Sequence, residues 1–145
     1  MSVWSNIAYP IAGFASGDPM FALCMSLLGI SSAYSHKTHD WIWDWMGMYL
    51  VFAYLILHDL PVTFALCAPI ALYAVKVFDL MSYAVVGVMW AIVWAMTGFD
   101  ASVALYFGIA IVIRQIGQVT EYEFLHSLWH VLSAIGLLEM RHALG

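Results

Sequence analysis

Charged residues are what this sequence has least of. Only four Lys and Arg and nine Asp and Glu occur among its 145 residues, so 9% of the chain is charged. A soluble domain of ordinary composition carries about a quarter charged residues, which help to cover its surface. Because 65% of the residues here are hydrophobic, the chain cannot build such a surface, and we expect an integral membrane protein.

Basic residues and cysteines are also too few for two other classes of protein. With four basic residues and a net charge of −5, the chain lacks the positive surface that binds nucleic acid. Two cysteines, Cys24 and Cys67, cannot build a disulfide framework, and both lie in apolar runs. We expect both to be small buried hydrophobic side chains. The first residues carry no positive charge, so we expect no cleaved signal peptide.

Clusters of polar or helix-breaking residues divide the chain into seven apolar segments. The segments lie near 3–15, 19–35, 43–58, 61–76, 80–97, 101–116 and 121–140. Most have about 16 residues and would form helices about 24 Å long, which is short for a hydrocarbon core of about 30 Å. Because the connections are short, we predict an all-α fold, a compact bundle of seven transmembrane helices forming one domain over 1–145. The first segment contains Pro10 and Gly13, so six spans remain an alternative.

Several residues mark the expected ends of these helices. Asp18 and Asp100 each precede an apolar segment, and Asp59 lies two residues before Pro61, so all three are interpreted as caps at the N-terminus of a helix. The polar cluster 114–123 divides the last two segments, and its residues Gln115, Gln118 and Glu121 are interpreted as part of a loop. Three alternating tryptophans at the start of the third segment are interpreted as anchors at the membrane interface. They are Trp41, Trp43 and Trp45.

The basic residues predict the orientation in the membrane. In a seven-span bundle, Lys37, Lys76 and Arg114 fall on the same side as the N-terminus, and Arg141 falls on the other side. The positive-inside rule then places the N-terminus in the cytoplasm and the C-terminus outside.

Histidines gather at the cytoplasmic end of this predicted bundle. His126 and His130 are four residues apart, so their side chains lie on one face of a helix and can converge on one point. Ionisable side chains are costly inside a membrane, and such a pair indicates a metal or proton site. His36, with Ser32 one turn before it, ends the second segment at this same end, and Asp44 opens the third. Three histidines, a serine and a carboxylate can therefore meet at one depth.

Three histidines at one depth favour a metal site. Three neutral imidazoles with one open position are the pattern of catalytic zinc, where water is the fourth ligand. Zinc lowers the pKa of that water towards about 7 and polarises a carbonyl group, which suits hydrolysis. We therefore expect His36, His126 and His130 to bind Zn²⁺.

These residues resemble the motifs of the CREST superfamily. The likeness consists of Ser32-x3-His36, an aspartate at the start of the third segment, and His126-x3-His130 in the seventh. The superfamily comprises seven-helix membrane proteins, among them alkaline ceramidases and the adiponectin/progestin receptors, and its members are known or suspected metal-dependent hydrolases. The resemblance implies a zinc-dependent hydrolase that cleaves an amide or ester bond in a lipid.

The resemblance also implies roles for the two remaining polar residues. Asp44 would be the acid/base or water-orienting residue, and Ser32 would form a hydrogen bond at the metal site. Asp44 follows His36 more closely than in ceramidase-like sequences, so Asp40 remains a rival for the acid/base role. Glu123, one turn before His126, would be a partner of that histidine or a charge at the entrance. The chain is shorter than typical members.

Three alternatives stay open at this point. The chain could be a receptor-like protein, or a non-catalytic subunit that binds partner membrane subunits, with a structural zinc ion. His36-x2-His39 and Glu123-x2-His126 are superficially similar to di-iron motifs. His36 opposite His126 could instead hold a haem. Membrane lipids are the expected partners, one of them as substrate, and no nucleic acid is expected.

Overall fold

The computed structural model describes residues 3–58, 79–121 and 123–145, and these form helices without a strand. A 3-10 helix, η1 (Val3–Ile7), leads into α1 (Ala8–Ala15). The longer helices are α2 (Pro19–Thr38), α3 (Ile42–Ile56), α5 (Asp79–Met96), α6 (Ala101–Thr120) and α7 (Glu123–Ala143). The predicted all-α fold is confirmed for this part of the chain, and the predicted segment 61–76 lies outside it.

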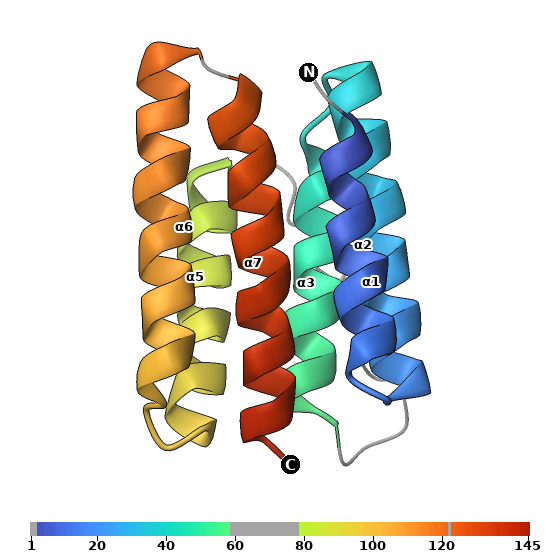
Figure 1. The fold of residues 1–145 in the computed structure, drawn as a ribbon, viewed down its shortest axis with the longest axis vertical. Coiled ribbons are helices and arrows are strands. Elements are labelled where there is room, and N and C mark those ends of the chain that lie inside the picture. Colours follow the sequence, from blue (N-terminus) through green and yellow to red (C-terminus); the bar gives the residue numbers. More distant parts are fainter. Residues whose placement is uncertain (1–2, 59–78, 122) are drawn as a thin grey trace.

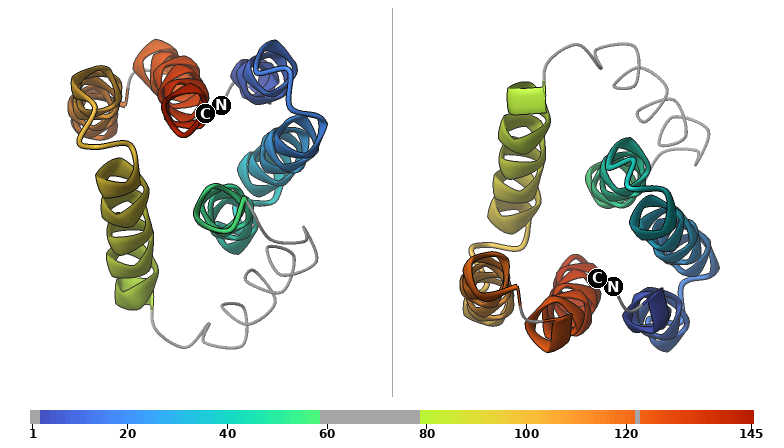
Figure 2. Two further views of the ribbon diagram at one scale, coloured as in Figure 1. Left: turned by 90° about the horizontal axis from the view of Figure 1, so that it is seen from below. Right: turned by 90° about the horizontal axis from the view of Figure 1, so that it is seen from above.

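The helices follow one another around a ring. Figure 2, seen along the helices, shows α1, α2 and α3 on one side, α5 and α6 on the other, and α7 closing the ring beside α1. In Figure 1, α2 and α6 run opposite to α1, α3, α5 and α7, so α2 ends where α7 begins. The N-terminus lies at this same end, and the C-terminus lies at the opposite end. The last turn of α2 and the first turns of α7 are thereby brought to one end of the bundle.

Aspartates begin two of the helices, as the sequence predicts. One carboxylate oxygen of Asp18 accepts hydrogen bonds from the backbone N–H groups of Met20 and Phe21, at 2.9 and 3.0 Å. Asp100 likewise accepts from the N–H groups of Ser102 and Val103, at 2.8 and 3.2 Å. These two predicted caps are confirmed, and the third, Asp59, lies outside the described residues. They satisfy N–H groups that have no partner within the helix, and so fix the start of α2 and α6.

The polar cluster at 114–123 does not end the sixth helix where expected. Helix α6 continues through Arg114 to Thr120 and ends where Glu121 adopts a left-handed conformation with φ 55°. The assignment of Gln115 and Gln118 to a loop is therefore wrong. Arginine and glutamine are good helix formers, so a polar stretch does not by itself end a helix. Arg114 lies six residues before the end of α6, about 9 Å from that end along the helix.

Buried apolar side chains fill the contacts between the helices. Helices α6 and α7 approach closely at Gly136, where an added Cβ atom would lie 2.8 Å from the ring of Phe107. Cys24 is buried with 1% of its surface exposed, as expected, whereas Cys67 lies outside the described residues. The helices are thus held together by shape and apolar contact, and polar groups gather at the two ends of the bundle.

The outer surface of the bundle is apolar on several helices. One described helix, α6, is long and apolar enough to cross a membrane, and two shorter apolar helices cover Ile42–Ile56 and Val85–Met96. Large apolar side chains point outward along four helices at spacings of three or four residues. They include Ile7, Ile11 and Phe14, then Leu23, Leu27 and Ile30, then Val88, Ile92 and Met96, and finally Leu105, Ile109, Val112 and Ile116.

Candidate metal centre

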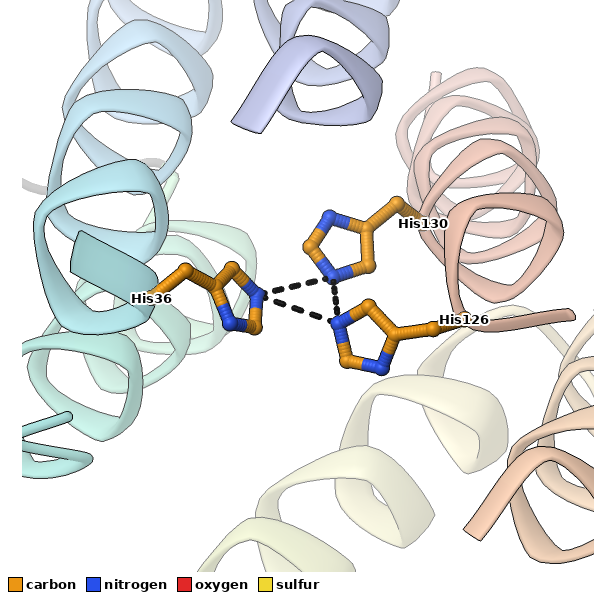
Figure 3. A group of neighbouring side chains, drawn as sticks. All are labelled: His36, His126 and His130. Atoms are coloured by element: carbon orange, nitrogen blue, oxygen red, sulfur yellow. Dashed lines mark hydrogen bonds between the residues drawn. The ribbon is translucent and has the colours of Figure 1, made fainter. Parts of the chain in front are cut away.

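Three histidines from two helices meet at the end of the bundle where α2 ends and α7 begins. His36 lies in the last turn of α2, while His126 and His130 lie in the first two turns of α7. Figure 3 shows the three imidazole rings pointing at one another across the space between these helices. The structure therefore brings together the histidines that the sequence singles out, as a group that could hold a metal ion.

The three Nε2 atoms form a nearly equilateral triangle. Nε2 of His36 lies 3.2 Å from that of His130 and 3.1 Å from that of His126, and the remaining pair is 3.0 Å apart. In a tetrahedral zinc site with Zn–N distances of about 2.0–2.1 Å, two nitrogen ligands lie about 3.3 Å apart. His130 is fully buried and His36 is 4% exposed, so both nitrogens are shielded from solvent. The triangle has the size and burial of a metal site.

Hydrogen bonding among the histidines cannot account for this arrangement. A bond between two imidazoles needs one N–H group and one lone pair, and each Nε2 atom has a single site in its ring plane. In the triangle each Nε2 atom faces two others, so the three contacts cannot all be satisfied. The Nδ1 atoms of His36 and His130 are buried without a hydrogen-bond partner among the described residues. A cation between the Nε2 atoms removes the conflict, and the donor set therefore fits a metal.

Aromatic rings hold the imidazoles in place. Trp129 meets the ring of His130 edge-on, with centroids 4.7 Å apart, and Trp41 meets His36 in the same way at 5.5 Å. Tyr9, which is 1% exposed, lies with its ring 5.7 Å from that of His130. These contacts restrict the rotation of the imidazoles and exclude water from one side of the site. Tyr9 was not predicted from the sequence, because nothing else in its segment indicates that this segment lies beside the histidines.

A cavity of about 600 Å³ opens beside His126, with walls from α3, α6 and α7. Asp44, in the first turn of α3, lines this cavity and is half-buried. Asp40 is exposed and accepts a hydrogen bond from the backbone of Ile42 at 3.3 Å, at the start of α3. Of the two rival aspartates, Asp44 is therefore the one that shares a space with a histidine of the site.

Ser32 and Glu123 occupy different surroundings. Ser32 is fully buried one turn before His36, and its hydroxyl is an electrostatic neighbour of the Asp44 carboxylate. Within the described residues, Ser32 Oγ forms no hydrogen bond of ordinary distance and angle. Glu123 is exposed and lines the mouth of the cavity, which fits an entrance charge.

Four further cavity residues were assigned no role at the site from sequence. Trp41 and Trp45 line the cavity, although their spacing suggested membrane anchors, and so do Trp129 and Arg114. Trp41 lies three residues before Asp44, on the same helical face, and this spacing was the available signal. Arg114 was used only to predict the orientation in the membrane, because it lies in the polar cluster that divides two segments.

No protein-family model matches this chain, and no match occurs among curated proteins or solved structures. Its function is therefore inferred from the side chains of the site and the surface around them.

Proposed function

We propose that this chain is an integral-membrane, zinc-dependent hydrolase of the CREST type, which cleaves an amide or ester bond in a lipid. The convergence of three Nε2 atoms, two of them on buried histidines, beside a cavity that also holds a carboxylate carries this proposal. Bound at His36, His126 and His130, zinc would polarise a carbonyl group and lower the pKa of a coordinated water towards about 7.

The remaining polar residues supply what such a reaction needs. Asp44 lies where it can accept a proton from water in the cavity and return it to the leaving group. The buried hydroxyl of Ser32, beside Asp44, can donate a hydrogen bond to oxygen atoms that gain charge during the reaction. Three neutral imidazoles leave the positive charge of the metal uncompensated, so it acts fully on the substrate carbonyl.

The membrane setting is part of this proposal. Seven spans, with the N-terminus and the histidines on the cytoplasmic side, are supported by the short turns and by the outward apolar side chains of four helices. Polar backbone groups inside a bilayer must be paired within the protein, and helices meet this requirement. A membrane also explains why so many large apolar side chains face outward on helices without a protein neighbour there.

Metal analysis of the purified protein is the decisive experiment. We expect about one zinc ion per chain, and its loss in His126→Ala, since His126 supplies one of three ligands. The His39→Ala variant is the matched control, because His39 is an exposed histidine at the same end of the bundle and lies outside the group of three histidines. Purified protein without metal, or with equal loss in both variants, would contradict the proposal.

A structural zinc ion is the second candidate. The ligands come from α2 and α7, and both of these helices pack against α1. A metal ion bound here would therefore link the two helices that contact α1. In that case His130→Ala should unfold the bundle, and the wild-type protein should hydrolyse no lipid ester or amide. A folded and inactive His130→Ala variant of an active wild type supports catalysis instead.

The geometry disfavours the two redox alternatives. The axial nitrogens of a bis-histidine haem lie on opposite sides of the iron with the macrocycle between them, whereas the Nε2 atoms here are at most 3.2 Å apart. For a di-iron centre, His39 and Glu123 would have to join the group, but both are exposed to solvent. A colourless protein that contains zinc and no iron is the expected result.

A further inference from the structure

Arg114 and Asp44 bring opposite charges into the same cavity from two different helices. Arg114 lies on α6 and Asp44 in the first turn of α3, and both are half-buried where they line the cavity. The two side chains are electrostatic neighbours of each other, and His126 has both of them as electrostatic neighbours. A positive and a negative side chain therefore lie beside the same histidine of the candidate centre.

Trp129 connects the arginine to the histidines. The guanidinium carbon of Arg114 lies 5.2 Å from the centre of the Trp129 ring. The centre of one ring of Trp129 lies 4.7 Å from that of His130, and the tryptophan lies 5.6 Å from the ring of His126. A guanidinium above an aromatic face carries its N–H donors in its own plane, so a ring contact and a carboxylate partner are compatible. Arg114 is thus placed to hold Asp44 at a fixed position relative to the histidines.

Asp44 lies close to the three histidines without joining them. The ligand atoms of His36, His126 and His130 lie within 4.8 Å of one another, and among the described residues no carboxylate belongs to this group. Carboxylate oxygen is nevertheless a common ligand of zinc, and an ionised carboxylate is attracted to a divalent cation. A competing positive charge would keep the Asp44 carboxylate from the metal, and Arg114 is placed to supply it.

We propose that Arg114 is a positioning residue, which pairs with the Asp44 carboxylate and keeps it out of the fourth coordination position of the metal. That position then stays open, as it does in catalytic zinc sites. The inference rests on the proposed function for its metal centre. It also explains why a permanent positive charge lies beside a cation site, where a charge without a carboxylate partner would oppose metal binding.

Binding of imidazole to the protein loaded with Co²⁺ tests the inference, because the visible absorption of Co²⁺ changes when a ligand enters its open position. Imidazole is uncharged, so its affinity does not depend directly on the charges that the variants remove. We expect Arg114→Gln to weaken imidazole binding about ten- to a hundredfold, because Asp44 then competes for the open position. In the double variant Arg114→Gln/Asp44→Asn the affinity should return to within about twofold of the wild-type value, since an amide is a poor metal ligand.

Two further variants provide the controls. Lys37→Gln removes a positive charge from an exposed position at the same end, outside the cavity lining, and should leave imidazole binding unchanged. Arg114→Lys keeps the charge without the planar fork, so its imidazole affinity should lie between those of the wild type and Arg114→Gln. This variant also tests the inference if Arg114→Gln does not fold. A merely structural arginine would lower Co²⁺ content and thermal stability together, and Asp44→Asn would not restore them.

Each other result counts against the inference. Unchanged imidazole binding in Arg114→Gln and Arg114→Lys, an equal loss in Lys37→Gln, or no recovery in the double variant would overturn it. Lipid hydrolysis by the zinc-loaded forms of the same samples separates the two proposals. Hydrolysis by the wild type without any effect of Arg114 on imidazole binding refutes the inference alone. Loss and recovery of imidazole binding in a protein that hydrolyses no lipid refutes the hydrolase alone, and a protein that binds no metal refutes both.

Discussion

Asp44 is a half-buried acidic side chain that lines the same cavity as His126, and its replacement isolates one chemical step. An amide in Asp44→Asn keeps the size of the side chain but cannot accept a proton. We expect the variant to keep its zinc and its thermal stability, while hydrolysis of a lipid ester or amide falls about 10²–10⁴-fold. Asp40→Asn, at an exposed position nearby, should retain full activity. Loss of zinc together with activity in Asp44→Asn would instead make Asp44 a metal ligand.

The histidines were predictable from sequence because each carries a positional signal. A spacing of four residues places His126 and His130 on one face, and counting segments places His36 at the same depth. Tyr9 and Arg114 lack such a signal. Tyr9 reaches His130 only because α1 and α7 are neighbours across the closure of the ring, a long-range contact that local spacing does not encode. The convergence of the three histidines was therefore predictable, but the side chains that surround them were not.

At the scale of helices, Asp18 joins three elements at the end of the bundle opposite to the histidines. While one carboxylate oxygen caps α2, the other accepts hydrogen bonds from the Tyr54 hydroxyl of α3 and the Arg141 guanidinium of α7, both at 2.7 Å. Burial opposes ionisation of this carboxyl, but the donors, led by the Phe21 N–H and Arg141, outweigh it and lower the pKa of Asp18.

This interaction predicts a dependence of stability on pH. Because the folded-state pKa of Asp18 lies below its ordinary value of 3.8, its contribution is complete above about pH 4 and is lost as the pH falls through the folded pKa. At neutral pH, Asp18→Asn should lower stability by about 1–2 kcal/mol, since asparagine caps a helix but does not pair with Arg141. Thermal unfolding in detergent should show the difference shrinking below about pH 4.

Asp100→Asn provides the matched comparison for Asp18. Asp100 also caps a helix and its pKa is also lowered, first by the hydroxyl of Ser102 and then by backbone N–H groups of α6. Its side-chain hydrogen bonds stay within the start of α6, so the substitution should cost less than Asp18→Asn. An equal loss in the two variants would show that the contacts to Tyr54 and Arg141 add nothing to stability.

Most helix boundaries were predictable because prolines, glycines and capping aspartates mark them chemically. The predicted segment 19–35 became Pro19–Thr38, and 80–97 became Asp79–Met96. The error came at 114–123, where polarity was equated with the end of a helix. A helix at the edge of a bundle can present polar residues to a cavity without stopping, and Arg114 does so.

At the scale of the whole molecule, the polar groups separate to two ends and leave an apolar middle. The N-terminus, the end of α2 and the start of α7 lie at one end of the bundle, and the start of α2, the end of α7 and the C-terminus lie at the other (Figure 1). The histidines and the cavity belong to the first end, while Asp18 and Arg141 belong to the second. Between them, outward apolar side chains run along α1, α2, α5 and α6. A bilayer would impose this division on a helical bundle, and the proposed orientation would place the two ends in different compartments.

Labelling from one side of the membrane tests this arrangement. Single cysteines are introduced at two exposed positions, Thr38→Cys at the histidine end and Gly145→Cys at the other end. In right-side-out vesicles, an impermeant maleimide should label Gly145→Cys at once and Thr38→Cys only after the membrane is opened, since the positive-inside rule places the histidine end in the cytoplasm. The parent protein is the control for the native cysteines, of which Cys24 is buried. Immediate labelling at both positions would mean that the two ends share one compartment, and a protein that alkaline carbonate releases from the vesicles would not span the bilayer.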